Sequence, residues 1–330
     1  MANIKDVAKH AGVSVTTVSR CFNNRGYISQ STRDKIEMAC KELNYQPNEI
    51  ARSLFKKKSN IIGVIIPRLD SYFFAELLQY IEDLLYKKGY KMLLCSTNGD
   101  EYKEKSYLDM FKAQKVDGVI IASYLTEDHY DYTNIGMPAV AFDRHLHGDI
   151  KCIGSDHYQA GVLATQKLID LGCRKLAHFR GQSIVSSPTH NKTKAFMDLA
   201  IAQNIEHCVI EKQVSRDSEE EFDRCMTELN NIMPDYDGIF LNDFDAVIFL
   251  QYANRNGIRV PDDVQVIGID DIKLSHMVTP QITTVKQSYD LISQTMVESL
   301  IKLIDGETIS SKNLDKLPVE LIERNTTKSP

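Results

Sequence analysis

Residues 14–23 near the N-terminus combine one arginine with short hydroxyl and amide side chains, a mixture suited to reading DNA. Arg20 can form a bidentate pair with guanine, while Val15 and the Thr16 methyl group can contact a thymine methyl. The short hydrogen-bond donors around them are of the kind that contact phosphates and set the register on the duplex. The alternative is that these residues are only helix caps and surface polar groups. We favour a DNA-reading surface made of Ser14, Val15, Thr16, Thr17, Ser19, Arg20 and Asn23.

A second set of polar and aromatic residues follows hydrophobic segments farther along the chain. Carboxylates and amides exchange hydrogen bonds with vicinal hydroxyls, and an aromatic face suits the apolar patch of a sugar. Taken singly, each residue is more readily explained as a cap or turn former. Their shared position, each after a strand-like segment, favours a sugar-binding site instead. The candidates are Asp70, Tyr72 and Phe73 after IIGVIIP, Asp143 after VAF, Asn242 and Asp243 after IFL, and Asp270 after VIGI.

The DNA-reading residues must be positioned by helices, and the pattern around them predicts these. Ile4, Val7, Ala8 and Ala11 recur at the spacing of one helical face, after Asn3 as a cap. Gly12 supplies a tight turn, and Ser14 caps a second helix from Val15 to about Phe22, with Val18 and Phe22 on its buried face. Two short helices joined by a glycine turn are a helix-turn-helix, whose second helix enters the major groove.

A third helix and an uneven charge distribution support the same interpretation. This helix is capped by Ser29 or Ser31, and Asn44 ends it in the left-handed conformation. The chain carries a net charge of −6, but residues 1–58 hold eleven Lys or Arg and five Asp or Glu, which leaves −12 on the remainder. A basic head on an acidic body is typical of a DNA partner. Charge alone leaves open a basic tail without a specific partner.

From Asn60 onward, hydrophobic strands alternate with amphipathic helices in two successive sets. The first set contains IIGVIIP, YKMLLCS and DGVIIA, and the second contains KLAHFR, DGIFL and VQVIGID. Such alternation predicts two parallel sheets with helices on both faces, so that ligand would lie at the carboxyl ends of the strands. The expected fold is therefore an all-α helix-turn-helix head followed by an α/β core of two doubly wound subdomains.

The head and the following segment resemble one known family. IKDVAKHAGVSVTTVSRCFNN, then STRDKIEMACKELNYQPNEIARSLFKKKSNIIGVIIP, is similar to the lactose and galactose repressor family, and the match extends from Ile4 to LPVELIERNTT. NNRGYIS and YQPNEIARSLFKKKSN are similar to sucrose-operon repressors of Gram-positive bacteria. The resemblance implies a repressor of a carbohydrate operon that binds a palindromic operator as a homodimer and responds to a sugar or sugar phosphate. It also implies a core like the periplasmic binding proteins.

The resemblance implies domain boundaries as well. Because the chain of this fold crosses three times between the subdomains, a late segment should return to the first subdomain. We expect a DNA-binding domain over 1–47, a hinge and linker over 48–58, and a core over 59–330. Within the core we expect an N-subdomain over about 60–157 and 287–316, and a C-subdomain over about 158–286 and 317–325.

Residues 48–58 would form the hinge. NEIARSL is far shorter than a helix that is stable alone in water, so it should become helical only when held. By the resemblance, the hinge helices of two subunits pair over the minor groove, with contacts from Asn48, Ala51 and Leu54. Leu54 would be the wedge at the central base step, and Ala51 would allow close approach. The alternative is a plain basic linker.

The resemblance also singles out effector contacts. Phe73, Asn242 and Asp270 stand where relatives hold their effector. Lys192 replaces an arginine that relatives commonly present four residues before an aromatic, here Phe196. Arg216 stands where several relatives carry a stacking aromatic. Both differences add positive charge, so a phosphorylated sugar becomes a candidate effector.

Other classes of protein are disfavoured. The sequence contains no G-x-G-x-x-G, G-x-x-x-x-G-K, G-x-S-x-G or H-E-x-x-H, so neither an enzyme nor a cofactor is expected. The seven cysteines form no C-x-x-C pair, which disfavours a metal site. No window is apolar enough for a membrane span, and the first residues lack a signal-peptide core, so we expect a cytoplasmic protein. The C-terminus lacks leucine heptads, which favours a dimer.

Three alternatives to a sugar-controlled repressor remain open. One is a regulator of the same fold driven by a protein corepressor, as the catabolite control proteins are. The second is a freestanding sugar receptor, which would keep every activity without residues 1–58. The third is an enzyme acting on sugars, which would show turnover.

Overall fold

The computed structural model describes residues 2–23, 25–46, 58–123, 131–181, 187–212, 236–310 and 314–328. The chain divides into two compact units, Met1–Asn60 and Ile61–Pro330. We call them the head unit and the core unit, and each is described by itself.

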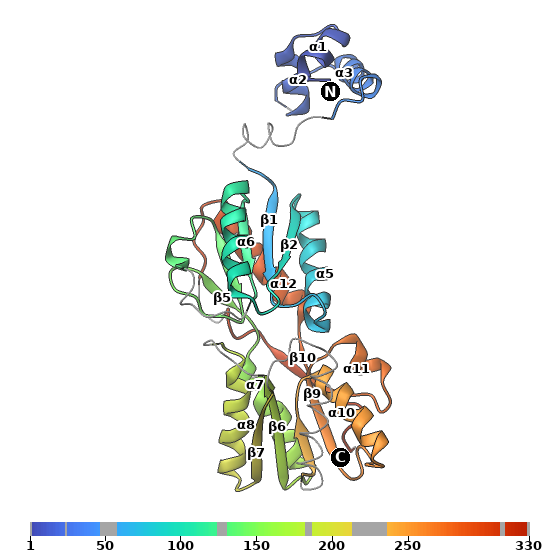
Figure 1. Ribbon diagram of the computed structural model, residues 1–330, viewed down its shortest axis with the longest axis vertical. Helices are drawn as coiled ribbons and strands as arrows, with labels where there is room; N and C mark the ends of the chain where they lie inside the picture. Colours follow the sequence, from blue (N-terminus) through green and yellow to red (C-terminus); the bar gives the residue numbers. More distant parts are fainter. Residues whose placement is uncertain are drawn as a thin grey trace. The chain divides into compact units, whose positions relative to one another are not determined.

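The head unit contains three helices (Figure 1): α1 (Ile4–His10), α2 (Val15–Phe22) and α3 (Gln30–Glu42). Asn3 caps α1 in a capping box with Asp6, and Ser14 caps α2 by accepting from the amide of Thr17. Gly12 (φ +66°) and Asn44 (φ +46°) adopt the left-handed conformation expected of them. A small core of Val7, Val18 and Ile36, all with no exposed surface, holds the helices together. The helix-turn-helix prediction is confirmed.

The first half of the core unit, the N-subdomain, is a five-stranded parallel sheet. Its strands, in spatial order, are β2 (Lys91–Ser96), β1 (Ile61–Ile66), β3 (Gly118–Ile121), β4 (Ala139–Phe142) and β5 (Lys151–Ile153). Helices α5 (Tyr72–Lys87) and α12 (Tyr289–Ile304) bury their apolar sides on one face, and α6 (Glu101–Gln114) covers the other. A 3-10 turn, η2 (Tyr132–Asn134), precedes β4. Strands buried on both faces explain why their sequences are continuously hydrophobic.

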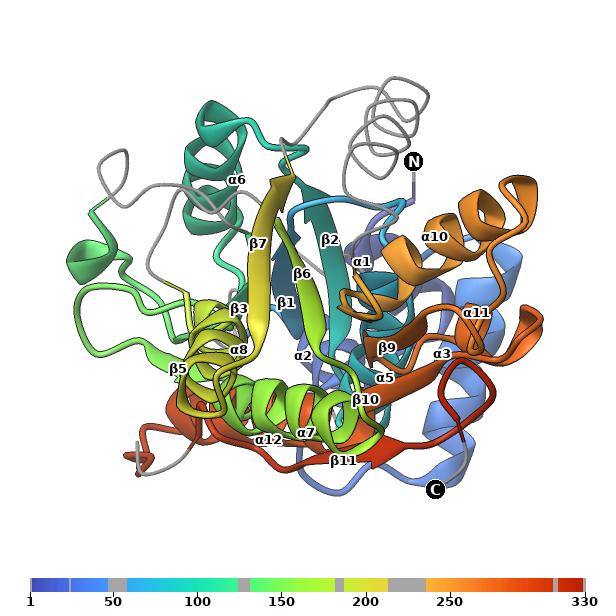
Figure 2. The same cartoon turned by 90° about the horizontal axis from the view of Figure 1, so that it is seen from below.

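The second half, the C-subdomain, is a six-stranded sheet in which all neighbours are parallel except β10 and β11. Its strands, in spatial order, are β11 (Val319–Ile322), β10 (Thr283–Gln287), β9 (Gln265–Asp270), β8 (Gly238–Phe240), β6 (Lys175–Gly181) and β7 (Glu206–Lys212). Helices α7 (His157–Asp170) and α8 (His190–Ala202) cover one face, and α10 (Asp243–Arg255) covers the other (Figure 2). A short helix, α11 (Lys273–Met277), follows β9.

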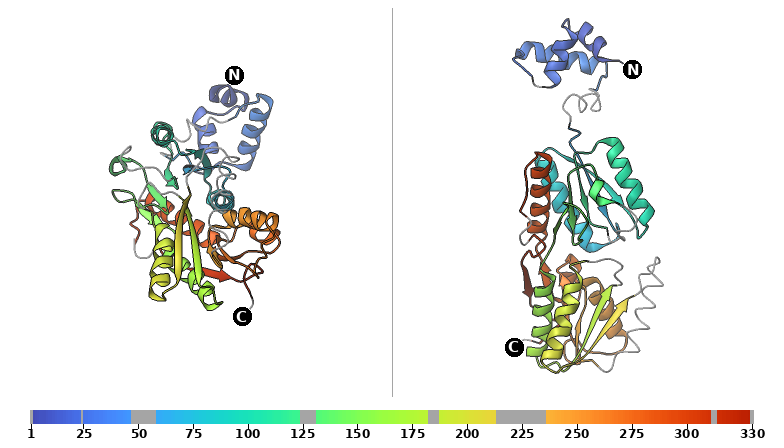
Figure 3. Two further views of the ribbon diagram at one scale, coloured as in Figure 1. Left: turned by 60° about the horizontal axis from the view of Figure 1, so that its bottom comes forward. Right: turned by 90° about the vertical axis from the view of Figure 1, so that its left-hand side faces the viewer.

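The chain passes between the two sheets three times. It enters the C-subdomain after β5, returns with α12, and leaves again to form β11. Helix α12 packs on the N-subdomain, where it contacts α5, β3 and β4 (Figure 3). The two-subdomain α/β fold is confirmed. Strand β7 was not predicted, because this edge strand carries charges at both ends and is only half-buried.

Candidate DNA-reading helix and effector site

Helix α2 presents Val15, Thr16 and Arg20 to solvent. Val15 is 40% exposed, which leaves its methyl groups available for contact. Thr16 and Arg20 are four residues apart, so they share one side of the helix, opposite to the fully buried Val18. Val15, in the first turn, lies three residues before Val18 and borders this exposed side. Exposed apolar and guanidinium groups side by side can read base edges in a groove.

The other predicted DNA contacts on α2 already take part in the helix. The hydroxyls of Ser14 and Thr17 lie 2.8 Å apart, and the amide of Thr17 donates to Ser14 Oγ at 3.0 Å. Asn23 Nδ2 donates to the carbonyl of Ser19 at 2.8 Å. These residues are caps as well as candidate phosphate contacts. The two roles are compatible, because a capping hydroxyl at a helix end can also contact a phosphate.

The buried side of α2 contains one residue beyond the prediction. Val18 is buried as expected, and Phe22, which is half-buried, packs against the head core and stacks on Tyr45 with ring centroids 6.2 Å apart. The addition is Cys21, which is 8% exposed and lies three residues after Val18, on the same side of the helix.

Four predicted contacts lie outside the described residues. They are the hinge residues Asn48, Ala51 and Leu54, and Arg216 in the C-subdomain. The predicted contacts of these four residues with DNA or effector rest on the resemblance to relatives.

Asp143 ends β4 in the left-handed conformation (φ +48°) and is 2% exposed. Its Oδ2 lies 2.9 Å from His157 Nε2, whereas its Oδ1 is buried and has no hydrogen-bond partner. His157 Nδ1 is likewise buried without a partner. Ser187 of the C-subdomain donates to the carbonyl of Asp143 at 2.7 Å, so this site lies where the subdomains meet. Strained backbone and unmet polar atoms together are typical of a ligand site.

Asp270 ends β9 in the C-subdomain, also at positive φ (+119°). Gln287 Nε2 donates to its Oδ1 at 2.7 Å, and the Oε1 of Gln287 is buried without a partner. Burial raises the pKa of Asp270 to about 6, while the positive charge of Lys192 acts in the opposite direction. The charges of His157 and of Asp143 in the N-subdomain also act on this pKa. The site therefore draws polar groups from both sheets.

An aromatic wall adjoins these groups in the N-subdomain. Phe73 lies against Phe142 and Tyr289, with ring centroids 5.7 Å and 5.3 Å apart. The Tyr289 hydroxyl is buried without a hydrogen-bond partner. Burial raises the pKa of Tyr289, and the negative charge of Asp270 raises it further, so the hydroxyl keeps its proton and can donate. Aromatic faces beside unmet donors and acceptors suit the two kinds of surface on a sugar.

Two of the predicted ligand residues serve other contacts. Asp70 is exposed and accepts two hydrogen bonds from Arg68, at 2.8 Å and 2.5 Å. That ion pair holds the pKa of the Asp70 carboxyl below its usual value. Asn242 caps α10, with Oδ1 accepting from the amide of Asp245 at 2.9 Å and Nδ2 donating to its carboxylate at 2.8 Å. Both side chains have the local roles that turn and cap residues usually have.

Asp243 requires a correction to the predicted ligand set, because its carboxylate is enclosed within the C-subdomain. It has no exposed surface and accepts from the amide of Ile272 at 3.0 Å and from the hydroxyls of Ser275 and Thr284 at 2.6 Å each. Burial raises its pKa to about 8. The hydrogen bonds of Asp243 hold α10, α11 and β10 together. We therefore do not include Asp243 among the proposed effector contacts.

Three residues at the site were missed by sequence reasoning: His157, Gln287 and Tyr289. Gln287 is the last residue of β10, and Tyr289 begins the next helix. The rule that found Asp270, a polar residue at the end of a strand, would have found Gln287 had β10 been assigned. His157 had no comparable signal, because it opens a helix.

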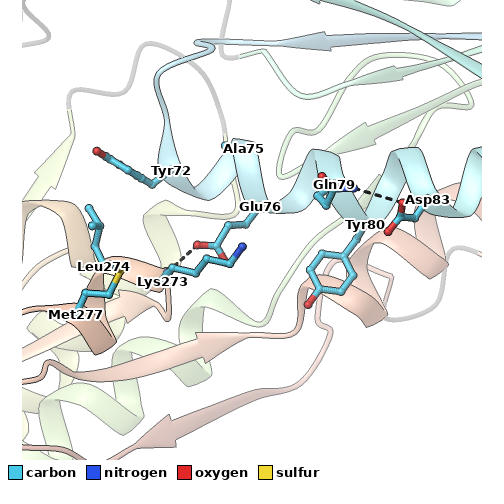
Figure 4. Close-up of a pocket in the computed structure, with 9 residues that line it drawn as sticks. All are labelled: Tyr72, Ala75, Glu76, Gln79, Tyr80, Asp83, Lys273, Leu274 and Met277. Atoms are coloured by element: carbon cyan, nitrogen blue, oxygen red, sulfur yellow. Dashed lines mark hydrogen bonds between the residues drawn. The ribbon is translucent and has the colours of Figure 1, made fainter.

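A separate groove of about 620 Å³ lies between α5 and α11, on the surface of both subdomains (Figure 4). Helix α5 contributes Tyr72, Glu76 and Tyr80, and α11 contributes Lys273 and Met277. The amide of Lys273 donates to Glu76 Oε1 at 2.6 Å, which links the subdomains at this point. Nearby, Tyr72 stacks on Phe244 of α10 with centroids 5.5 Å apart. The predicted contact Tyr72 therefore lies at this groove, 46% exposed.

Two negative findings apply to the part of the chain that the structure describes. No helix there is long and apolar enough to cross a membrane. The same residues contain no group of three or more His, Cys, Asp or Glu side chains that could hold a metal ion.

Comparisons with known proteins cover both units. Residues 3–48 match the family of bacterial regulatory proteins, lacI family, and residues 165–327 match a periplasmic binding protein-like domain. A ribose operon repressor of Halalkalibacterium halodurans is 37% identical, over 99% of this chain and 98% of its own length. A sucrose operon repressor of Pediococcus pentosaceus is 38% identical, over 97% of this chain and 98% of its own.

Solved structures show the same relationship. The lac repressor dimer, bound to operator and the anti-inducer ONPF, has a TM-score of 0.85 at 28% identity and covers 99% of each chain. A periplasmic binding protein/LacI transcriptional regulator from Alkaliphilus metalliredigens, complexed with D-xylulofuranose, has a TM-score of 0.73 at 34% identity. It covers 82% of this chain and 100% of its own.

Proposed function

Because this chain belongs to the lacI family of bacterial regulatory proteins, we propose that it represses a carbohydrate-utilisation operon and leaves its operator when a sugar or sugar phosphate binds. It is a DNA-binding transcriptional repressor of that family and not an enzyme. As a regulator of transcription it would act in the cytoplasm.

The head unit supports operator recognition by α2. Arg20, Val15 and Thr16 are exposed together, so the helix can enter a major groove with a guanidinium and two apolar contacts directed at base edges. The lac repressor in its operator complex is a dimer. By analogy, two copies of this chain would bind a palindromic operator, with Asn48, Ala51 and Leu54 of each hinge over the minor groove.

The single observation that carries the effector proposal is a set of buried polar atoms without hydrogen-bond partners, which lie at strand ends and at the starts of two helices and come from both subdomains. They are Asp143 Oδ1, His157 Nδ1, Gln287 Oε1 and the Tyr289 hydroxyl. Unpaired polar atoms are costly in a protein interior unless a ligand or water meets them. Sugar hydroxyls both donate and accept, so one sugar on the face of Phe73 can satisfy such a mixture.

The same arrangement supplies a route from effector to operator. Asp143 belongs to the N-subdomain and Asp270 to the C-subdomain, so a ligand bonded to both fixes how the two halves meet. The groove at α5 and α11 also spans both halves, and Tyr72, Tyr80 and Met277 are exposed there at 46%, 44% and 76%. We place the contact with the second subunit on this face. Movement of the subdomains would then alter the spacing of the two hinges.

Operator release tests this function directly. A palindromic duplex is first selected from a random library by the purified protein, and its dissociation is then followed by fluorescence anisotropy. Ribose, fructose, sucrose and their phosphates are added in turn, and we expect at least one to release the duplex. Asp270→Ala should retain operator affinity and lose this response, because it removes a carboxylate at the effector site only.

The alternatives predict different results in the same experiment. If no duplex is enriched at any salt concentration, the chain is a receptor without a DNA function and the proposal is wrong. If no sugar or sugar phosphate changes operator affinity but a phosphorylated carrier protein does, regulation by a protein corepressor replaces the effector proposal.

A further inference from the structure

Three basic side chains gather where strand β6 ends and helix α8 begins. Arg180 lies at the carboxyl end of β6, and His190 and Lys192 lie in the first turn of α8. Arg180 Nε and His190 Nε2 are buried atoms without a hydrogen-bond partner. Among the described residues, no hydrogen bond or ion pair engages the ammonium group of Lys192. This part of the C-subdomain therefore holds several nitrogen donors that nothing in the chain satisfies.

These groups are close enough to influence one another electrostatically. Burial lowers the pKa of His190, and the positive charges of Arg180 and Lys192 lower it further. Glu211 on β7 pairs with Arg180 Nη2 at 2.5 Å and leaves Nε unbonded. The carboxylate of Glu211 is thus engaged by Arg180, and the ammonium group of Lys192 has no ion-pair partner among the described residues. An ammonium group without such a partner favours an anion.

The backbone at this position supplies a favourable dipole. At the start of α8 the amides of His190 and Asn191 donate to the carbonyls of Ser187 and Pro188, at 3.2 Å and 3.0 Å, so they are already bonded. The positive end of the helix dipole still attracts negative charge. A neutral sugar here would leave the ammonium group of Lys192 without a counter-charge, whereas phosphoryl or carboxylate oxygens can accept from all three basic side chains.

Lys192 connects the cluster to the effector site, because its charge also acts on Asp270. We propose that the effector is an anionic sugar whose phosphoryl or carboxylate oxygens bind Arg180, His190 and Lys192. Its hydroxyl groups bind the carboxylates of Asp143 and Asp270 at the same time. This inference rests on the proposed effector function and specifies the chemical class of ligand.

Isothermal titration of the full-length repressor tests the proposal with matched pairs of compounds. The pairs are fructose and fructose 6-phosphate, ribose and ribose 5-phosphate, and sucrose and sucrose 6-phosphate, with glucose and gluconate as the carboxylate arm. We expect at least one anionic member to bind about tenfold or more tightly than its neutral parent, the gain of a charge-assisted hydrogen bond over a neutral one. A gain in the phosphate pairs would identify the anionic group of the effector as a phosphate, and a gain with gluconate would identify it as a carboxylate.

Two variants and a matched control locate the effect. Lys192→Gln and His190→Gln should each reduce the ratio of anionic to neutral affinity by about tenfold while operator binding is unchanged. Lys194→Gln is the control, because Lys194 is an exposed cation on the same helix, already paired with Asp198. It should leave the ratio unchanged. Titration in buffers of different ionisation enthalpy should show proton uptake with the anionic ligand, and His190→Gln should abolish it.

The outcomes separate this inference from the function on which it rests. Neutral sugars that release the operator and bind as tightly as their anionic forms would leave the repressor function intact and overturn the anionic effector. An equal fall in the ratio of anionic to neutral affinity in Lys192→Gln and Lys194→Gln would also overturn it. Such a result would mean that the ligand responds to the overall positive charge of the protein and does not contact Lys192. If no sugar of either kind binds or releases the operator, the effector function itself fails and this inference fails with it.

Discussion

Asp143 and Arg144 are adjacent in the sequence, yet they belong to two buried networks of different kinds. Arg144 has no exposed surface, pairs with Glu104 at 3.1 Å and donates to the carbonyl of Ser123 at 3.0 Å. The Tyr132 hydroxyl also hydrogen-bonds to Glu104. Asp143 is almost as deeply buried, but it meets an imidazole on one oxygen and nothing on the other.

The difference separates structure from function within one stretch of chain. Each charge of a buried ion pair requires the other, because removing one partner leaves an uncompensated buried charge, so the first network is part of the N-subdomain's structure without a ligand. The second network leaves a carboxylate oxygen in a low-dielectric interior, where an unmet acceptor interacts strongly with any donor that arrives. A buried carboxylate oxygen without a donor, at the junction of the two subdomains, therefore distinguishes Asp143 from its neighbour.

The largest expected effect comes from breaking the ion-paired network around Arg144. Arg144→Met should lower the free energy of unfolding by about 3–5 kcal/mol, because it leaves Glu104 buried without its cation. Urea denaturation of the full-length protein measures this. Adding Glu104→Gln to Arg144→Met should restore part of the loss. A destabilisation below about 1 kcal/mol, in the range of exposed ion pairs, would remove the distinction between the networks.

Asp143→Asn tests the incomplete network and should act on binding. Effector affinity should fall by about 1.5–3 kcal/mol, the value of hydrogen bonds to a charged group, while stability is unchanged or higher because a buried charge is removed. Titration calorimetry and urea denaturation give the two quantities. Asp70→Asn is the control, since Asp70 is exposed and paired with Arg68. Equal effects of both substitutions on affinity would contradict the assignment of Asp143.

The sequence predicts much of this because local rules decide much of it. The capping box of Asn3 and Asp6, the left-handed Gly12 and the strand IIGVII follow from residue types at short spacing. The ends of the strands gave Asp143 and Asp270 by the same reasoning. Asp243 shows its limit: it too follows a strand, but donors from α11 and β10 enclose it. Only the tertiary structure distinguishes a carboxylate that is enclosed from one that is left open.

The groups that complete the site were harder to find, because they depend on contacts across the two sheets. Tyr289 reaches the site on a helix that returns from the C-subdomain to the N-subdomain, and His157 reaches it at the start of α7. No spacing in the sequence joins His157 to Asp143. The cation cluster at Arg180 is likewise visible only once β6 and α8 lie side by side.

Arg20→Ala extends the comparison to the head unit, where the functional side chains are exposed and hydrated. The free energy of operator binding should fall by about 1–3 kcal/mol, and the fall should depend on the base at one operator position, because one bidentate base contact is removed. Effector affinity should be unchanged. Anisotropy on the selected duplex and on single-base variants of it measures this loss. An equal loss on random DNA would make Arg20 a phosphate contact. Altered effector affinity would show that the two units are coupled through this side chain.

Asp243 is a third kind of buried carboxylate, bonded on both oxygens but facing no cation, and it gives the smallest effect. Burial raises its pKa to about 8 in the folded protein, against about 3.9 for an unfolded chain. Between these values the folded state holds a proton that the unfolded state lacks. The stabilisation from this group is therefore complete below the lower pKa and is lost as the pH rises through the higher one.

Between pH 6.5 and 7.5 the free energy of unfolding should fall by at most about 1.4 kcal/mol on account of Asp243. Asp243→Asn should remove this slope, because its amide does not titrate. The substitution can keep the local contacts, since the hydroxyl of Thr284 can accept where it now donates. Urea denaturation at both pH values, in both proteins, measures the difference. Equal slopes would mean that Asp243 is charged throughout, so that neutral donors alone suffice to bury a carboxylate here.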